Sequence, residues 1–238
     1  MIQRHSSQGL LTDRASRSAP EAVYEDLRAR ILHFDLAPDR VLSRADLAAE
    51  YGVSLTPIRE ALQALEQDGL VRIRPQSGTV VTRIDQSELE QAHFLRVAAE
   101  TEVVRRLAED PDPALLRRVR SLLSLQEVLV GDTEQMDMFS ELDRSFHRTL
   151  FEAAGVEKIH HMVARRMGHL MRCQRLELPE RGKMQSIVAA HRAVVEAIAA
   201  GDCDAATAAM RSHLAGTITR LEHLRDAFPA CFTETGES

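Results

Sequence analysis

The chain has 238 residues, of which 44% are hydrophobic and 28% are charged, a composition typical of a folded protein with one or two domains. Its 11 glycines and 8 prolines are few beside the many helix-forming residues, which favours a mainly α fold and argues against a β-sandwich or barrel. The 30 Lys and Arg residues against 36 Asp and Glu residues give a net charge of −6. Any contact with nucleic acid must therefore come from a local motif.

Cysteine usage and hydropathy bear on the compartment. The 3 cysteines have no Cys-x2-Cys spacing, which argues against a disulfide framework and a cysteine-based zinc site. The N-terminus has no apolar run long enough for a signal peptide. No stretch approaches the roughly 18 apolar residues of a membrane span. We therefore predict a cytoplasmic protein that makes no membrane contact.

The N-terminal segment changes character at Pro20. Residues 1–19 show no helical period, and we interpret them as a flexible arm. Pro20 suits the first turn of a helix. Val23, Leu27 and Ile31 then follow four residues apart, so they share one face of the predicted helix.

A helix–turn–helix pattern comes next. We predict a short helix over about residues 44–51 and another over about 55–68, with Ser43 and Ser54 as their N-caps. Gly52 lies where the turn between them needs a positive φ. In such a motif the N-terminal half of the second helix enters the major groove of DNA.

Two short, β-branched segments follow the motif. Residues 70–74 and 79–82 alternate in part, and the turn-rich tetrapeptide 75–78 separates them, which predicts a small β-hairpin. Beside a helix–turn–helix, such a hairpin forms a wing. Its tip would be Ser77 and Gly78, where glycine permits a close approach to the DNA backbone.

These elements predict a winged helix–turn–helix over residues 20–84. Hydroxyl groups bond phosphates or base edges, and arginine reaches guanine or phosphate. The candidate DNA contacts are Arg44, Ser54, Leu55, Thr56, Pro57, Arg59, Ser77 and Gly78. The spacing of Ala48 and Gly52 alone would equally suit a generic helical hairpin within a larger core.

The rest of the chain is predicted to be helical over residues 85–228, with residues 229–238 as a tail. Glycine, proline and aspartate interrupt the pattern and divide it into six helices of roughly 15 to 25 residues. The predicted breaks lie near 110–113, 131–132, 155, 179–182 and 201–202.

Four residues of this helical region have the chemistry of a metal site. Asp143 and His147 are four residues apart and share one helix face. His191 and His213 lie in two later helices among apolar neighbours. Three imidazoles and one carboxylate suit Zn, Ni, Mn or Fe(II), and an open coordination position would accept a ligand. Each histidine taken alone is more simply a packing or surface residue, because only clustering indicates a metal.

The N-terminal motifs resemble a known family. LSRADLAAEYGVSLTPIREALQALEQDGLV and RPQSGTVV resemble the DNA-binding domain of GntR-type bacterial transcription regulators, over about residues 20–84. The family's recognition helix usually begins Val-Ser-Arg-Thr-Pro. Leu55 replaces that arginine, which removes one expected base or phosphate contact, and Asp39 stands where Pro-Gly is common. The matching residues are Ser54, Thr56, Pro57, Arg59 and Gly78.

The helical region resembles the FCD effector domain of the FadR-like GntR subgroup, over about residues 85–228. The resemblance lies in LRVAAETEVVRRLAED, DRSFHRTLFEAAG, AAHRAVVEAIAAGD and AAMRSHL, and six helices resemble the VanR-type branch. It implies a divalent metal on Asp143, His147, His191 and His213. It also implies that Arg96 lies near an effector, where arginine suits bidentate carboxylate binding. His169 and Arg172 are further candidates for the same cavity.

The resemblance implies a homodimeric regulator, acting as a repressor, that binds double-stranded operator DNA and a small organic acid. A metal-responsive sensor is one alternative. A metal-dependent hydrolase is another, although the sequence has no HExxH motif, no His-Asp dipeptide and no nucleophile elbow centred on serine. We therefore expect no enzymatic activity.

Overall fold

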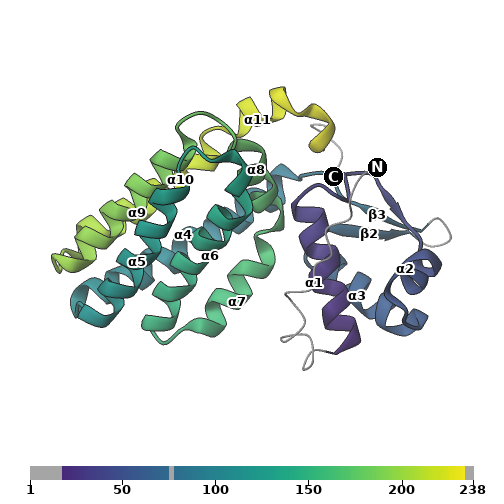
Figure 1. The fold of residues 1–238 in the computed structure, drawn as a ribbon, viewed down its shortest axis with the longest axis horizontal. Helices are drawn as coiled ribbons and strands as arrows, with labels where there is room; N and C mark the ends of the chain where they lie inside the picture. The colour runs from purple at the N-terminus through teal and green to yellow at the C-terminus, as the bar shows by residue number, and fades with distance from the viewer. Residues whose placement is uncertain (1–17, 75–77, 234–238) are drawn as a thin grey trace. The chain divides into compact units, whose positions relative to one another are not determined.

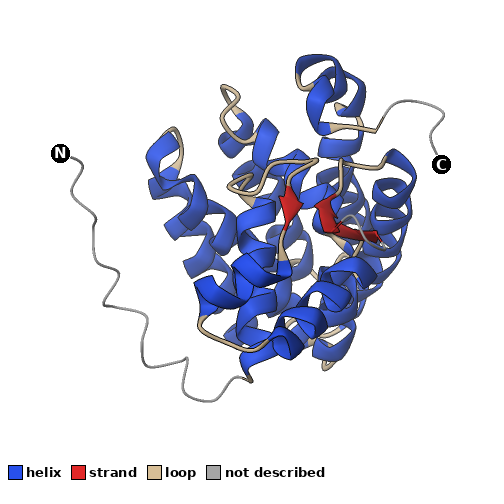
Figure 2. Ribbon diagram, turned by 90° about the vertical axis from the view of Figure 1, so that its right-hand side faces the viewer, coloured by secondary structure: helices blue, strands red, loops and turns tan. Residues whose placement is uncertain are grey.

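The computed structural model describes residues 18–74 and 78–233. The contacts within it divide the chain into two compact units, Met1–Arg83 and Ile84–Ser238. Figure 1 shows helices beside a small sheet in the first unit and a bundle of helices in the second, and Figure 2 shows that most of the chain is helical. Most of the predicted arm, residues 1–17, lies outside the described residues, and helix α1 already begins at Ala19.

The first unit contains the predicted helix–turn–helix with its wing. Its helices and strands are α1 (Ala19–Leu32), β1 (Val41–Leu42), α2 (Arg44–Tyr51), α3 (Leu55–Gln67), β2 (Val71–Arg74) and β3 (Gly78–Val81). The strands form an antiparallel sheet in the order β1-β3-β2. The prediction contained only the hairpin, because a strand of two residues is too short to show an alternating pattern.

Local signals set the limits of α2 and α3. The Ser43 hydroxyl accepts a hydrogen bond from the backbone N–H of Asp46, as predicted for an N-cap. Gly52 ends α2 with a φ of 66°, a conformation that costs glycine little. Ser54 is the N-cap residue of α3, but its side chain makes no capping hydrogen bond.

Polar contacts hold the three helices and the wing of the first unit together. Arg30 on α1 donates to Glu50 on α2 over 2.8 Å. The Glu66 carboxylate on α3 accepts from the backbone N–H of Ile73 on β2 over 2.6 Å. Beneath them, apolar residues of α1 and α3 are fully buried, including Leu27, Ile31, Ile58, Leu62 and Leu65. The wing and the helices thus form one compact unit.

The second unit has eight α-helices among its described residues, so the prediction of six was wrong. They are α4 (Gln86–Glu109), α5 (Pro113–Leu129), α6 (Met136–Ala153), α7 (Glu157–Arg166), α8 (Gly168–Glu177), α9 (Lys183–Ala199), α10 (Cys203–Ile218) and α11 (Leu221–Ala227). The missed breaks fall at Met167 and at residues 219–220, where no proline or Gly-Asp pair marks them. The helix count therefore no longer supports the VanR-type branch.

The core of the second unit explains how distant helices meet. α4, α5, α6, α9 and α10 each contribute an apolar stripe, as expected for amphipathic helices packed in a bundle. Phe146 of α6, Val195 of α9 and Met210 of α10 are fully buried in one continuous cluster. The candidate metal ligands lie on these same three helices, so packing of the stripes brings them together.

The predicted tail is partly structured. Residues Pro229–Cys231 form a 3-10 helix. Ile84 donates its backbone N–H to the carbonyl of Cys231 over 2.7 Å, and Thr233 donates back to Ile84 over 3.0 Å. Phe232 is buried, and this apolar anchor holds the segment against the start of the second unit.

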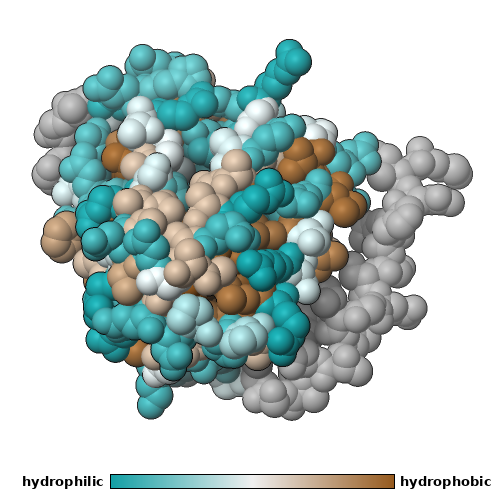
Figure 3. All heavy atoms as spheres, turned by 90° about the vertical axis from the view of Figure 1, so that its left-hand side faces the viewer, coloured by the Kyte–Doolittle hydropathy of each residue, from teal (hydrophilic) through white to brown (hydrophobic). Residues whose placement is uncertain are grey.

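The surface mixes polar and apolar residues. In Figure 3, brown apolar side chains lie interspersed with teal hydrophilic ones on the face that is drawn. Within residues 18–74 and 78–233, no helix combines the length and the apolar character needed to cross a membrane.

Candidate functional site

The second helix of the helix–turn–helix, α3, has two distinct faces. Its inner face buries Ile58, Ala61, Leu62 and Leu65. The opposite face exposes residues of the first two turns, namely Ser54, Leu55, Thr56 and Arg59, with Pro57 half-buried between them. The N-terminal half of α3 is therefore free of the unit's own core, as a helix that enters the major groove requires.

The surroundings of α3 include the other predicted DNA contacts. Arg44 is exposed at the first position of α2. Gly78 begins β3 with a φ of 95°, and a Cβ there would lie 3.2 Å from Cγ1 of Val41. Glycine at 78 is thus required within the wing itself, whatever it contacts outside. Ser77 lies outside the described residues.

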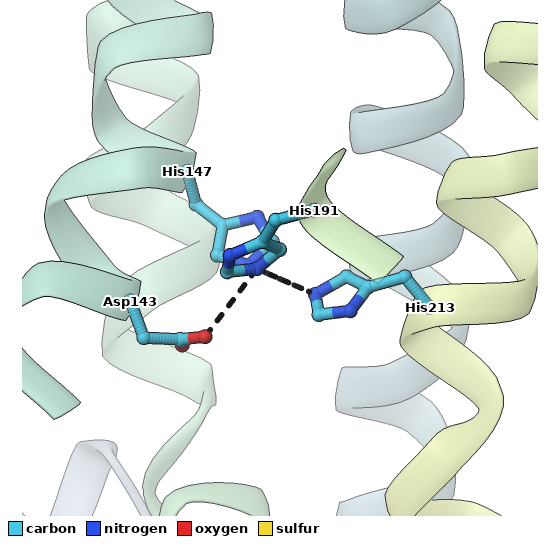
Figure 4. A group of neighbouring side chains, drawn as sticks. All are labelled: Asp143, His147, His191 and His213. Carbon is cyan, nitrogen blue, oxygen red and sulfur yellow. Dashed lines mark hydrogen bonds and ion pairs between the residues drawn. The ribbon is translucent and has the colours of Figure 1, made fainter. Parts of the chain in front are cut away.

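The four candidate metal ligands converge in the second unit. Asp143 and His147 project from α6, His191 from α9 and His213 from α10 (Figure 4). One ligand atom from each lies within 4.8 Å of all the others. The Nε2 atom of His213 is 3.2 Å from Nε2 of both His147 and His191, and Nε2 of His191 is 3.5 Å from an oxygen of Asp143.

Two polar side chains fix the orientation of the buried histidines. Nδ1 of His147 lies 2.5 Å from Oε2 of Glu100, and Nδ1 of His191 lies 2.9 Å from Oε1 of Gln126. An ionised carboxylate only accepts hydrogen bonds, so Nδ1 of His147 carries the proton. The same assignment suits His191, and it leaves the Nε2 lone pairs of both rings pointing into the cluster. The ring of Phe146 stacks on His191 at 4.0 Å.

The protonation states of these groups follow from burial and neighbouring charge. Burial lowers the pKa of His191 and of His213 well below the usual value, and the neighbouring histidines and Arg96 lower both further. Burial opposes ionisation of Glu100, but its interactions with His147 and Arg96 outweigh burial and hold the pKa of that carboxyl well below its usual range. Neutral imidazoles beside ionised carboxylates are the states that bind a metal ion.

The donor set fits a divalent transition metal. Two atoms that each bind one zinc ion at 2.0–2.1 Å lie roughly 2.9–3.4 Å apart. The Nε2 atom of His213 lies 3.2 Å from Nε2 of both other rings, so three imidazole nitrogens meet at one point. His191 is 3.5 Å from Asp143, while the widest separation in the cluster is within 4.8 Å. Nitrogen with one oxygen donor suits Zn, Ni, Mn or Fe(II).

Arg96 of α4 reaches the same cluster. It is buried, with Nε donating to Oε1 of Glu100 over 2.6 Å and Nη2 lying 2.9 Å from Nε2 of His147. A guanidinium only donates, so the Nε2 lone pair of His147 accepts this bond. Arg96 and Glu100 therefore surround one candidate ligand from both sides of its ring.

The structure does not bring His169 and Arg172 into this cluster. Both are buried on α8. Nδ1 of His169 accepts from the backbone N–H of Asp85 over 3.0 Å, and Nη2 of Arg172 lies 3.0 Å from the same atom. Asp85 caps the start of α4, about three helical turns, or roughly 15 Å, from Arg96. Burial lowers the pKa of Arg172 to about 10.

Two residues beside the cluster, Glu100 and Gln126, were not predicted from the sequence. Arg96 and Glu100 are four residues apart, which is the spacing of an ion pair on one helix face, so the sequence contained a signal for Glu100. Gln126 offers none, because only the packing of α5 against α9 brings its amide to His191.

The fold and the site define a class of protein: a winged helix–turn–helix unit joined to a helical unit with a candidate metal centre, an arrangement suited to a ligand-responsive transcription regulator. Residues 20–81 match the model of the bacterial regulatory proteins of the gntR family, and residues 91–216 match the FCD domain. The chain belongs to the GntR family of bacterial transcription regulators and has an FCD domain.

Individual relatives agree with this assignment. The chain is 38% identical to an uncharacterized HTH-type transcriptional regulator of Streptomyces ambofaciens, over 88% of each chain. It is 27% identical to the HTH-type transcriptional repressor RspR of Escherichia coli K12, over 90% of this chain and 93% of that one. Both relatives are named as transcription regulators.

A solved structure shows the same fold. E. coli McbR/YncC matches with a TM-score of 0.71 and 20% sequence identity, over 87% of this chain and 98% of that chain. At this level of identity the likeness establishes the architecture of the chain alone.

Proposed function

We propose that the chain is a repressor whose affinity for operator DNA changes when a small organic acid binds at a metal centre in its FCD domain. Residues 20–84 bind DNA, and residues 85–228 bind the effector and dimerise. Asp143, His147, His191 and His213 hold one divalent ion, and Arg96 receives the acid. The observation that carries the proposal is the convergence of one ligand atom from each of the four residues within 4.8 Å.

The DNA-binding part of the proposal rests on the exposed face of α3. Ser54, Thr56 and Arg59 reach base edges and phosphates in the major groove, while Arg44 and the wing contact the backbone. A homodimer presents two such helices, so its operator is a pseudo-palindrome with half-sites roughly one helical turn apart or less.

The effector part of the proposal rests on charge. A divalent ion gives the buried cluster local positive charge, which favours an anion over a neutral analogue. Four protein ligands leave coordination positions for a carboxylate at an octahedral ion. Arg96 supports an acid effector over a response to metal alone, because a cation beside the ligands has no use in a pure metal sensor. It does suit a second ligand with negative charge.

Elemental analysis and thermal stability test the effector site together. We expect purified protein to carry about one divalent ion per chain. We also expect small carboxylates, sugar acids included, to raise the melting temperature, and a chelator to abolish that rise. Amides of the same acids serve as matched neutral controls. A chain that takes up no Zn, Ni or Mn, or a stabilisation that survives chelation, would contradict the proposed site.

A further inference from the structure

The Nε2 lone pair of His147 faces two competing partners. Arg96 already donates to this atom over 2.9 Å. Glu100 holds the opposite nitrogen of the ring over 2.5 Å and fixes the proton there. A neutral imidazole has one lone pair in the plane of its ring. At any one time, Nε2 of His147 can therefore either accept the hydrogen bond from Arg96 or bind a metal ion.

Charge adds to this competition. Arg96 is buried, and a guanidinium group carries a positive charge. A divalent ion beside it meets repulsion that the low-dielectric interior strengthens. Asp143 and Glu100 bring one negative charge each, so a divalent ion together with Arg96 leaves one positive charge in excess. One carboxylate removes that excess.

We propose that Arg96 opposes metal binding until an anion binds its guanidinium group. The site would then bind a divalent metal and a monocarboxylate cooperatively. The inference rests on the proposed metal site. When an anion binds, Arg96 donates its Nη2 hydrogen bond to the anion and no longer to His147. The Nε2 lone pair of His147 is then available to the metal. Glu100 retains Nε of Arg96, which keeps the guanidinium beside the cluster during the exchange.

The sign of one effect separates this role from an ordinary positioning role. A residue that orients a metal ligand weakens metal binding when it is removed, by about 10- to 100-fold. Removal of Arg96 frees the lone pair of His147 and relieves the repulsion, so metal binding becomes tighter. A hydrogen bond to a charged group contributes about 1.5–3 kcal/mol, which corresponds to a gain of about 10- to 150-fold.

Zinc affinity measured by competition with a chromophoric chelator tests the proposal, with acetate as the anion and acetamide as its neutral isostere. In the full-length wild type, acetate tightens zinc binding and acetamide does not. Arg96→Met binds zinc alone about tenfold or more tightly than the wild type, and acetate adds nothing. Arg106→Met, which removes an exposed arginine on the same helix, behaves as the wild type.

Arg96→Met leaves Glu100 buried without its cation, which could destabilise the fold. A second variant controls for this effect. The double change Arg96→Met with Glu100→Gln removes the ion pair as a neutral unit and keeps an amide oxygen to accept from His147. It also loses the response to acetate. Weaker or unchanged zinc binding in both variants overturns the competition, while a wild type that binds no zinc with or without acetate overturns the proposed metal site as well.

A separate observation concerns the recognition helix. Leu55 opens α3, and 58% of its surface is exposed, on the same face as Thr56 and Arg59. An aliphatic side chain makes no hydrogen bond to a base edge, but it packs against the C5-methyl group of thymine in the major groove. We infer that Leu55 contacts a thymine methyl group in each operator half-site, an inference that rests on the proposed role of α3.

Replacement of thymine by uracil, which removes only the methyl group, tests this inference. The operator is first selected from random duplexes with the wild type, and each thymine is then replaced in turn. One position per half-site should lose several-fold in affinity with the wild type and nothing with Leu55→Ala. Indifference of the wild type to every replacement, or the same loss in the variant, refutes the contact. If no operator is selected, the DNA-binding role of α3 itself fails.

Discussion

The exposed face of α3 and the buried histidine cluster differ in how the sequence encodes them. The face of α3 lies within one helix of 13 residues, Leu55–Gln67. The cluster joins Asp143 and His147 on α6 to His191 on α9 and His213 on α10. The first is built by local rules of capping and amphipathicity. The second exists only after the bundle has packed.

This difference has a consequence for mutations. A change on the exposed face of α3 removes a proposed contact with DNA and leaves the core intact. A change in the cluster alters a candidate ligand that other helices hold in place, so each side chain there depends on partners far away in sequence. If the two regions differ in this way, variants of the cluster lower metal affinity and variants of α3 lower DNA affinity.

Loss of one ligand should break the cluster. His191→Leu keeps a similar side-chain volume beside Phe146 but offers no donor atom. Loss of a residue that only hydrogen-bonds a metal ligand lowers metal affinity by about 10- to 100-fold. Loss of a ligand itself should cost more, so we expect metal affinity to fall by at least about 100-fold. Titration of metal-free protein measures it. His223→Leu, at an exposed histidine, is the matched control, and an equal loss there would show that the effect is not local.

Loss of one contact on α3 should weaken DNA binding without affecting the metal. Arg59→Ala removes an exposed side chain from the face of α3 that is proposed to contact DNA. If Arg59 bonds a base, operator affinity falls by about 1–3 kcal/mol, or roughly 5- to 150-fold. A gel-shift titration at fixed salt measures it beside Arg118→Ala, an exposed arginine of the second unit. Unchanged affinity in Arg59→Ala would exclude this face of α3 as the reading surface.

An outer partner should have a smaller effect than a ligand. Gln126→Leu removes the amide oxygen that accepts from His191 and leaves the orientation of that ring unfixed. We expect metal affinity to fall about tenfold, at the low end for an outer-shell residue, with folding retained. The measurement is the same metal titration. A wild-type affinity in this variant would mean that packing alone orients His191.

Acid should destabilise the metal-free chain through the same buried rings. The pKa of His191 and of His213 is lowered in the folded state, so between about pH 6.5 and that lower pKa the unfolded chain binds more protons. Stability is therefore full above pH 6.5 and is lost as the pH falls, by up to about 1.4 kcal/mol per histidine at pH 5.5. Urea unfolding with chelator present at pH 7.5 and 5.5 measures it. His191→Leu should show a smaller pH dependence, and an unchanged one would contradict the cause.

Much of the first unit was predictable because its signals are adjacent in sequence. Ser43 caps α2 and Gly52 takes the positive φ of the turn, as predicted from the sequence. Strand β1 was not predictable, since Val41 and Leu42 join the sheet only by pairing with β3. The prediction succeeds where one residue's conformation is set by its neighbours.

The second unit was predictable as helix and less so in its breaks and its site. Met167 separates α7 from α8 without a proline or a preceding turn signal. The sequence pattern therefore predicted one continuous helix there. The four candidate ligands were predicted through resemblance and not through spacing, because spacing relates Asp143 to His147 but not to His191. Packing also places His169 at the start of α4. It had been a candidate for the effector cavity beside Arg96.

The most direct test of the whole account is operator affinity measured under four conditions at one salt concentration. The protein is titrated with metal, with metal and the acid that stabilises it most, with chelator, and with chelator and that acid. We predict that the acid lowers operator affinity by about 5- to 150-fold in the presence of metal and leaves it unchanged with chelator. Equal release of DNA from chelated protein, or no change under any of the four conditions, would contradict the account.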